Sequence, residues 1–218
     1  MIKTLVTSLL LAASFSASAA ANNYEDSTLN NTFDSAVNLN PFFGKGFSAD
    51  IGDSAGNNTS GSAPWVSVNG RGNGAIDYFK FTTNAAGRVI VDIDYATYPN
   101  PNGFDSFLTL YNSSFVKLAS NDDHYAAAGA GGTYDYGYSN YHSLDSFLQL
   151  EDLAAGTYYV GVSQCCSNIT PIPIQNGIKY TMQLQAQVAP VPEPETYALM
   201  GMGLVGLLAA RRSKAQKA

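Results

Sequence analysis

The chain has 218 residues, of which 45% are hydrophobic and 13% charged, and its formal net charge is −6. Residues 22–195 hold all 17 acidic residues but six of the 11 basic ones, which gives this part a net charge of −11. That charge argues against nucleic acid or an anionic membrane surface as a partner, and the length predicts one folded domain with a sizeable core.

The first 21 residues predict a secretory signal peptide. Lys3 is followed by an apolar run and then by small residues at 17–19, which is the order of charge, apolar stretch and small residues that signal peptidases recognise. The apolar run is shorter than the roughly 20 residues of a bilayer-spanning helix, so the sequence favours a removed signal over an anchor. We therefore expect the folded domain at residues 22–189.

Short β-rich runs alternate with turn clusters through this domain. In one of them Val89, Val91 and Ile93 share one face, while Asp92 and Asp94 lie on the other, which is the period of two expected for a strand. The pattern predicts an all-β fold, an antiparallel β-sandwich without helices. The predicted strands cover residues 64–68, 76–83, 88–95, 105–111, 115–120, 145–150, 157–163 and 179–186.

A six-residue frame occurs twice, as "DSFLTL" at 105–110 and "DSFLQL" at 145–150. Two copies do not make a repeat array, so we expect two equivalent strands of one sandwich. Alternation would direct Leu108 and Leu110, and likewise Leu148 and Leu150, toward the core, with an aspartate at each strand entrance.

Three segments, "AIDYFKFTTNAAGRVIVDIDY", "DSFLTLYNSSFVKLASNDD" and "LDSFLQLEDLAAGTYYVGVS", resemble the bacterial pre-peptidase C-terminal domain and its relatives. The resemblance spans about residues 28 to 186. It implies a jelly-roll-like β-sandwich of the kind attached to secreted proteases and surface proteins, with a secretion-linked, matrix-binding or stabilising role and no catalysis of its own.

Some relatives bind calcium at the N-terminal approach and before the Asp-aromatic strand, which implies a site here that includes Asn73 and Asp77. Asn30 and Asn31 stand where an Asn-Asp pair is typical, and Thr28 stands where a glutamate often precedes it. These departures lower the charge of the ligand set, and calcium depends on several carboxylate or carbonyl oxygens.

A second calcium site is an alternative at the turn "SNDDH", where side-chain oxygens crowd one tight loop near two strand entrances. Asn and Asp in turns also bond their own backbone, so a purely structural turn is the other interpretation. The candidate ligands are Asp105, Asn121, Asp122, Asp123 and Asp145.

Residues 124–143, "HYAAAGAGGTYDYGYSNYHS", are the most biased stretch of the domain and lie between the two DSFL strands. As a strand, the first three tyrosines would line one face and could stack on sugar rings or on another protein. As a loop, they would cover the sandwich or stay mobile. The candidate ligand-binding residues are Tyr134, Tyr136, Tyr138 and Tyr141.

The only two cysteines, Cys165 and Cys166, are adjacent, so they do not form a disulfide framework between distant parts of the domain. A vicinal disulfide, an intermolecular disulfide and free thiols remain open. The chain lacks CxxC and HExxH motifs, which leaves little support for zinc.

The C-terminal segment combines "VPEPET" at 191–196, an uncharged span at 196–210 and a basic tail at 211–218. It resembles the PEP-CTERM sorting signal, assigned here to residues 190–218. The resemblance implies recognition by exosortase, transient membrane insertion as a short transmembrane helix, and delivery to the cell surface or extracellular matrix. The matching residues are Pro192, Glu193, Pro194, Thr196, Arg211 and Arg212.

No nucleophile motif such as G-x-S-x-G accompanies His124 or His142, so a secreted hydrolase is the least favoured function. We expect an exported, non-catalytic surface or matrix protein whose partners are the secretion machinery, exosortase and extracellular polysaccharide or matrix proteins. The alternative is a calcium-stabilised structural module that binds no sugar.

Overall fold

The computed structural model describes residues 22–51, 58–94, 105–123, 134–135, 142–167, 170–188 and 202–203. The chain divides into two units, Ala20–Val191 and the two chain ends taken together. In the second unit the structure describes Met202 and Gly203, which are helical. Among the described residues no helix is long and apolar enough to cross a membrane.

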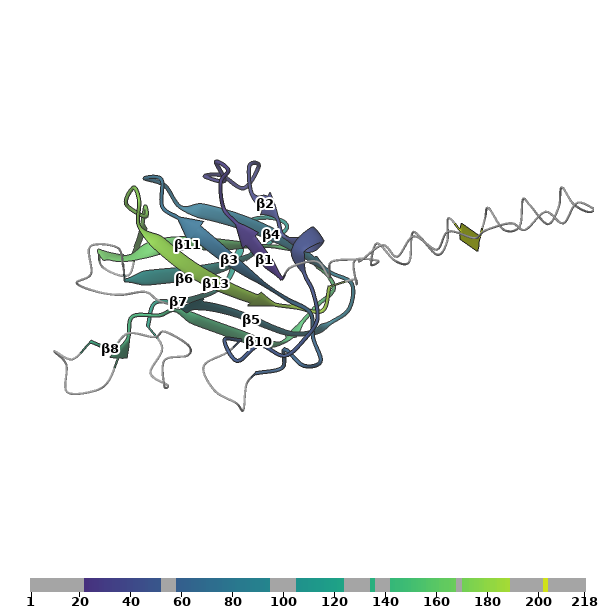
Figure 1. Ribbon diagram of the computed structural model, residues 1–218. Coiled ribbons are helices and arrows are strands. Elements are labelled where there is room, and N and C mark those ends of the chain that lie inside the picture. Colours follow the sequence, from purple (N-terminus) through teal and green to yellow (C-terminus); the bar gives the residue numbers. More distant parts are fainter. Residues whose placement is uncertain are drawn as a thin grey trace, which may run out of the picture. The chain divides into compact units, whose positions relative to one another are not determined.

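The first sheet of the domain has five strands in the order β1-β3-β13-β5-β10 (Figure 1). Its members are β1 (Asn23–Glu25), β3 (Trp65–Arg71), β13 (Lys179–Gln185), β5 (Gly87–Asp94) and β10 (Phe147–Leu153). β13 lies at the centre, where it pairs antiparallel with both β3 and β5. The strand closest to the C-terminus therefore completes this sheet.

The second sheet has the order β2-β4-β11-β6-β7, and β12 pairs with β11 beside this path. Its members are β2 (Val37–Asn38), β4 (Asp77–Thr83), β11 (Gly156–Ser167), β6 (Ser106–Asn112), β7 (Lys117–Asn121) and β12 (Thr170–Ile172). β8 (Tyr134–Asp135) and β9 (His142–Ser143) form a separate pair, and η1 (Asn40–Phe42) is a single 3-10 turn.

The two sheets enclose one hydrophobic core, which makes the domain a β-sandwich. Strict alternation supplies this core: Phe79 and Phe81 of β4 are fully buried, as are Val66 and Val68 of β3. Leu108 and Leu110 are buried in it and Leu150 packs against it, so the predicted inward leucines are confirmed. Large side chains from both sheets thus remove apolar surface from water, the main stabilising contribution to such a fold.

All eight predicted strands are present, but the expectation of antiparallel sheets is wrong. β1 pairs parallel with β3, and β2 pairs parallel with β4, so both sheets are mixed. These two strands contain three and two residues, and each lies at a sheet edge. A strand so short has no period to detect, and its direction depends on where the N-terminal segment crosses the sandwich.

The face of β5 opposite the core is also covered, which alternation alone does not show. Asp92 and Asp94 do lie on the face opposite Val91 and Ile93, yet both aspartates are buried. Gln183 Nε2 donates a hydrogen bond to Asp94 Oδ2 at 3.1 Å, so a neighbouring strand supplies a polar partner there.

The two DSFL copies occupy opposite sheets, with β6 in one and β10 in the other. They meet at their serines: Ser106 Oγ donates to Ser146 Oγ at 2.9 Å, and Ser146 N donates back to Ser106 Oγ at 2.9 Å. The repeated frame therefore marks a point where the two sheets are joined by hydrogen bonds.

Candidate functional site

The N-terminal approach, defined here as residues 26–36, lies against the beginning of β4. Tyr78 N donates to the Asn30 carbonyl at 2.8 Å, and Asp26 N donates to the Asn69 carbonyl at 3.0 Å. Immediately afterwards β2 pairs with Phe79 and Lys80. These contacts bring the approach next to the loop that precedes β4.

Hydrogen bonds among short polar side chains define a cluster at this junction. Asn30 Nδ2 donates to Asp26 Oδ2 at 3.2 Å, and Asn73 Nδ2 donates to Asn31 Oδ1 at 2.8 Å. Asp77 Oδ2 accepts a hydrogen bond from the Tyr180 hydroxyl at 2.8 Å. The oxygen cluster, as we name it, consists of Asp26, Asn30, Asn31, Asn73 and Asp77.

Three oxygens of the cluster lack a hydrogen-bond partner among the described residues although they are buried. They are Asn30 Oδ1, Asn73 Oδ1 and Asp77 Oδ1, and the side chains of Asn30 and Asp77 are fully buried. A buried acceptor without a partner costs about 1–3 kcal/mol, so three in one place indicate a missing electropositive group.

The electrostatics of the two carboxylates agree with this interpretation. Burial raises the pKa of Asp77 to about 7, and the nearby Asp26 raises it further. Burial also raises the pKa of Asp26, against the opposing hydrogen bonds from Thr28 and Asn30. Neither carboxylate forms an ion pair with any described residue. A bound cation would reverse both shifts, because it stabilises the charged forms.

The donor set fits calcium. Calcium takes six to eight oxygen ligands from carboxylates, amide carbonyls and water, and the cluster offers two carboxylates and side-chain amide oxygens. Asn73 and Asp77, expected from the family resemblance, are both members. Asp26 was missed, although its Oδ1 accepts from Thr28 N at 3.4 Å in the Asx arrangement typical of "DST".

The second predicted calcium site is only partly assembled. The carboxylate oxygens of Asp105 and Asp122 and the sulfur of Cys165 lie within 4.8 Å of one another. Burial, with Asp123 adjacent, raises the pKa of Asp122 to about 6. Cys165 is disulfide-bonded and therefore offers no thiolate to a metal.

Two other candidates at this site have structural surroundings. Asn121 Oδ1 accepts from Phe147 N at 2.9 Å, and its Nδ2 donates to the Asp123 carbonyl at 3.2 Å, so its amide links β7 to β10. Asp145 is buried at the entrance of β10. Calcium binding at this turn stays a prediction.

Several predicted residues lie outside the described part of the chain. Tyr134 is placed in β8 by its backbone alone, and the side chain of Cys166 is not described. Since Cys165 is bonded, the free-thiol alternative is wrong for that residue. The remaining residues outside the description are Tyr136, Tyr138, Tyr141, Pro192, Glu193, Pro194, Thr196, Arg211 and Arg212.

Comparison with known proteins gives one family match. Residues 190–213 match the PEP-CTERM protein-sorting motif, which confirms the sorting signal indicated by the sequence. The chain therefore carries the motif of an exported protein that is anchored in the membrane and then processed by exosortase. No curated protein matches the sequence.

Among solved structures, the chain is similar to the pre-peptidase C-terminal domain of a collagenase from Bacillus anthracis. The two share 16% identity, the match covers 55% of this chain and 85% of that one, and the TM-score is 0.31. This is the class of domain that the sequence resemblance indicated.

Proposed function

We propose that this protein is a non-catalytic component of the cell surface or extracellular matrix that associates with extracellular polysaccharide or matrix proteins. The observation that carries the proposal is the sorting motif at residues 190–213. It begins two residues after Val188, a member of the hydrophobic core of the sandwich. Processing at the motif would release a complete folded domain outside the cell.

The finer features of this proposal follow from the sequence. The sandwich is jelly-roll-like, residues 1–21 direct export, and residues 196–210 insert into the membrane as a short helix until cleavage. The tyrosines at 134, 136, 138 and 141 are a candidate contact for the matrix. Catalysis is not part of the proposal, because the chain offers no recognisable nucleophile or base motif.

The sorting step is tested by intact mass. The protein recovered from outside the native cells is expected to lack residues 1–21 and the end of the chain, whereas Glu193→Ala is expected to remain in the membrane fraction. Glu195→Ala, one residue outside the Pro-Glu-Pro motif, is the matched control and should be released. An extracellular mass that still contains residues 196–218 would mean that the tail is a permanent anchor.

The oxygen cluster supports a second, compatible role: we infer that calcium binding there stabilises the domain. Asp26 and Asp77 would provide charge and Asn30 and Asn73 neutral oxygens, while the metal would supply the positive charge that these buried atoms lack. The metal would join the N-terminal approach to the loop before β4.

Thermal unfolding measures this role. Calcium at about 100 times its dissociation constant adds ~2.7 kcal/mol, which raises the Tm of a domain of this size by roughly 5–10 °C. Asp77→Asn should lose most of that increase, whereas Asp123→Asn should keep it if the oxygen cluster is the site. An equal calcium effect in both variants would refute the assignment.

A further inference from the structure

The second sheet carries a group of five aromatic rings on the side facing away from the core. Phe33, from the N-terminal approach, lies among the other four. Its ring centroid is 4.5 Å from that of Tyr78, 5.1 Å from Tyr111, 4.4 Å from Phe115 and 5.5 Å from Tyr159. We name these five residues the aromatic face.

Strand register flanks the aromatic face with two cations. Tyr159 of β11 pairs with Lys80 of β4 on one side and with Tyr111 of β6 on the other, and Tyr111 pairs with Lys117 of β7. One row across four strands therefore reads lysine, tyrosine, tyrosine, lysine. Three strand spacings separate the lysines by about 14 Å.

The rings are accessible to a ligand. Tyr78, Tyr111, Tyr159 and Phe33 are partly exposed, and Phe115 is 45% exposed. Gly161 lies between Tyr78 and Tyr111, where an added Cβ would come within 3.2 Å of one ring and 3.4 Å of the other. The glycine thus permits the two tyrosines to approach the backbone of the central strand.

The backbone itself is strained to present Phe115. Its φ is 61°, and among the described residues it is the one non-glycine residue with a positive φ. The left-handed region is disfavoured for a bulky residue, and such strain often accompanies function. The Asn112 carbonyl of the side chain holds the turn by accepting from Ser114 N at 2.9 Å and Val116 N at 3.0 Å.

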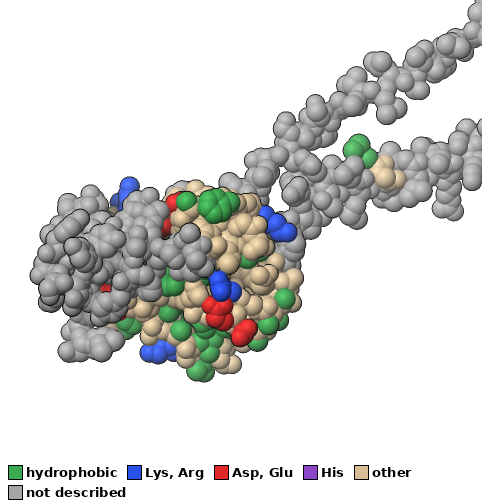
Figure 2. Space-filling model, turned by 90° about the horizontal axis from the view of Figure 1, so that it is seen from below, with side chains coloured by type: hydrophobic (Ala, Val, Ile, Leu, Met, Phe, Trp, Pro, Cys, Tyr) green, Lys and Arg blue, Asp and Glu red, His purple; other side chains and the backbone are tan. Residues whose placement is uncertain are grey.

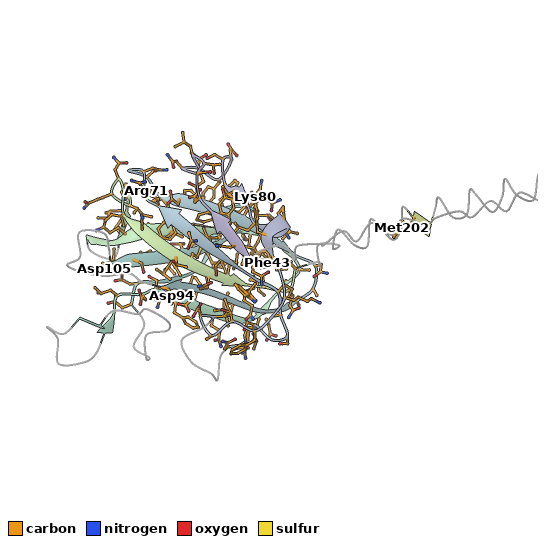
Figure 3. The ribbon with its side chains drawn as sticks, in the orientation of Figure 1. Phe43, Arg71, Lys80, Asp94, Asp105 and Met202 are labelled. Atoms are coloured by element: carbon orange, nitrogen blue, oxygen red, sulfur yellow. The ribbon has the colours of Figure 1, made fainter. Side chains whose placement is uncertain are left out.

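The charge of this surface differs from that of the domain. Residues 22–195 carry a net charge of −11 and six basic residues, two of which flank the aromatic row. The neighbouring outward positions carry hydroxyls, including Thr82 and Thr157 with their oxygens 2.9 Å apart. Lys80 lies on the β4 side, away from Asp94 and Asp105 (Figure 3), whereas the face seen from below carries acidic and basic side chains together (Figure 2).

We propose that the aromatic face, with Lys80 and Lys117, binds a polysaccharide of mostly neutral pyranose rings that carries carboxylates at intervals. The apolar face of a sugar ring lies against an aromatic ring, the tyrosine hydroxyls and threonines offer hydrogen bonds, and each lysine pairs with a carboxylate. A densely charged polyanion is disfavoured by the acidic domain. This inference rests on the proposed function and assigns the sugar contact to a surface other than the tyrosine run at 134–141.

Phe115→Gly tests the assignment, because glycine adopts a positive φ freely and the variant should fold while losing one ring. The probe is hyaluronan, in which sugars with and without a carboxylate alternate, and affinity electrophoresis of the full domain gives the dissociation constant. We expect Phe115→Gly to weaken binding about tenfold. Phe47→Ala, which removes an exposed ring elsewhere, should leave binding unchanged.

The double variant Lys80→Gln, Lys117→Gln is expected to weaken binding to hyaluronan but not to carboxyl-reduced hyaluronan. Equal binding by Phe115→Gly and the wild type overturns the proposal, as does a wild type that binds neither hyaluronan nor the polysaccharide of the native cells. If the four tyrosines at 134–141 prove necessary for retention in the native matrix while Phe115 does not, the proposed function stands and the aromatic face is the wrong contact.

Discussion

At the scale of single residues, Tyr180 connects the two sheets through the oxygen cluster. It lies in β13, and its hydroxyl donates to Asp77 of β4 at 2.8 Å. The ring occupies the space above Gly70, where an added Cβ would be only 2.0 Å from it, so this pairing position on β3 requires glycine. Burial raises the pKa of Tyr180 well above its usual value, which keeps the hydroxyl a donor.

Asp77 predicts a pH dependence for the metal-free domain. Its pKa is about 7 in the folded state and near 3.8 when unfolded, so the folded state binds more protons between these values. The free energy of unfolding must then fall as pH rises from about 4 to 7, by at most ~1.4 kcal/mol per pH unit from this group. Above pH 7 its contribution is constant.

Denaturant unfolding with and without calcium measures this dependence. Asp122 contributes in the same direction up to about pH 6, so the interval from pH 6 to 7 isolates Asp77 best. Asp77→Asn should flatten the profile there and exceed the wild type in stability at pH 7 without metal. The exposed Asp34→Asn is the control, and an unchanged slope in Asp77→Asn would contradict the assigned pKa.

At the scale of elements, the N-terminal approach connects the oxygen cluster with the aromatic face. Asn30 and Asn31 belong to the cluster, and Phe33 follows two residues later in a turn closed by the Thr32 and Ser35 hydroxyls, 2.8 Å apart. A metal that orders the approach would also fix the ring of Phe33. Two ligands that order one segment bind cooperatively, and the coupling is reciprocal.

We therefore expect calcium to increase affinity for hyaluronan roughly fivefold or more, a typical size for coupled sites. Titration of hyaluronan with and without EDTA measures the effect. In Asp77→Asn the two affinities should coincide, and this comparison also cancels any direct action of calcium on the polysaccharide. Calcium dependence that persists in the variant would show that the two sites are independent.

The sequence predicts those elements whose pattern is local. Period two identified β4, β5 and β11 because each alternates around buried residues such as Phe79 and Val160. β1 and β2 are too short to show a period, and their parallel pairing depends on the whole fold. Tyr78, Tyr111 and Tyr159 each stand beside an inward residue, yet only strand pairing brings them together around Phe33.

At the scale of the whole molecule, the order of elements separates the folded domain from the sorting signal. β13 is the central strand of its sheet and ends at Gln185, and the sorting motif begins at residue 190. The described core residues all precede the motif, the last of them being Val188. Folding therefore requires almost the entire chain up to the motif and nothing that the motif itself supplies.

Truncation tests this separation, because tolerance follows the burial of the residues removed. A protein of residues 22–191 should have the same Tm as one of residues 22–218 in detergent, within about 1 °C. A protein that ends at Ile178 lacks β13 and should not fold, since β3 and β5 would lose their shared partner and Met182 and Leu184 would leave the core. A loss of several degrees on removing residues 192–218 alone would mean that the tail stabilises the sandwich. The released domain would then differ in stability from its membrane-bound precursor.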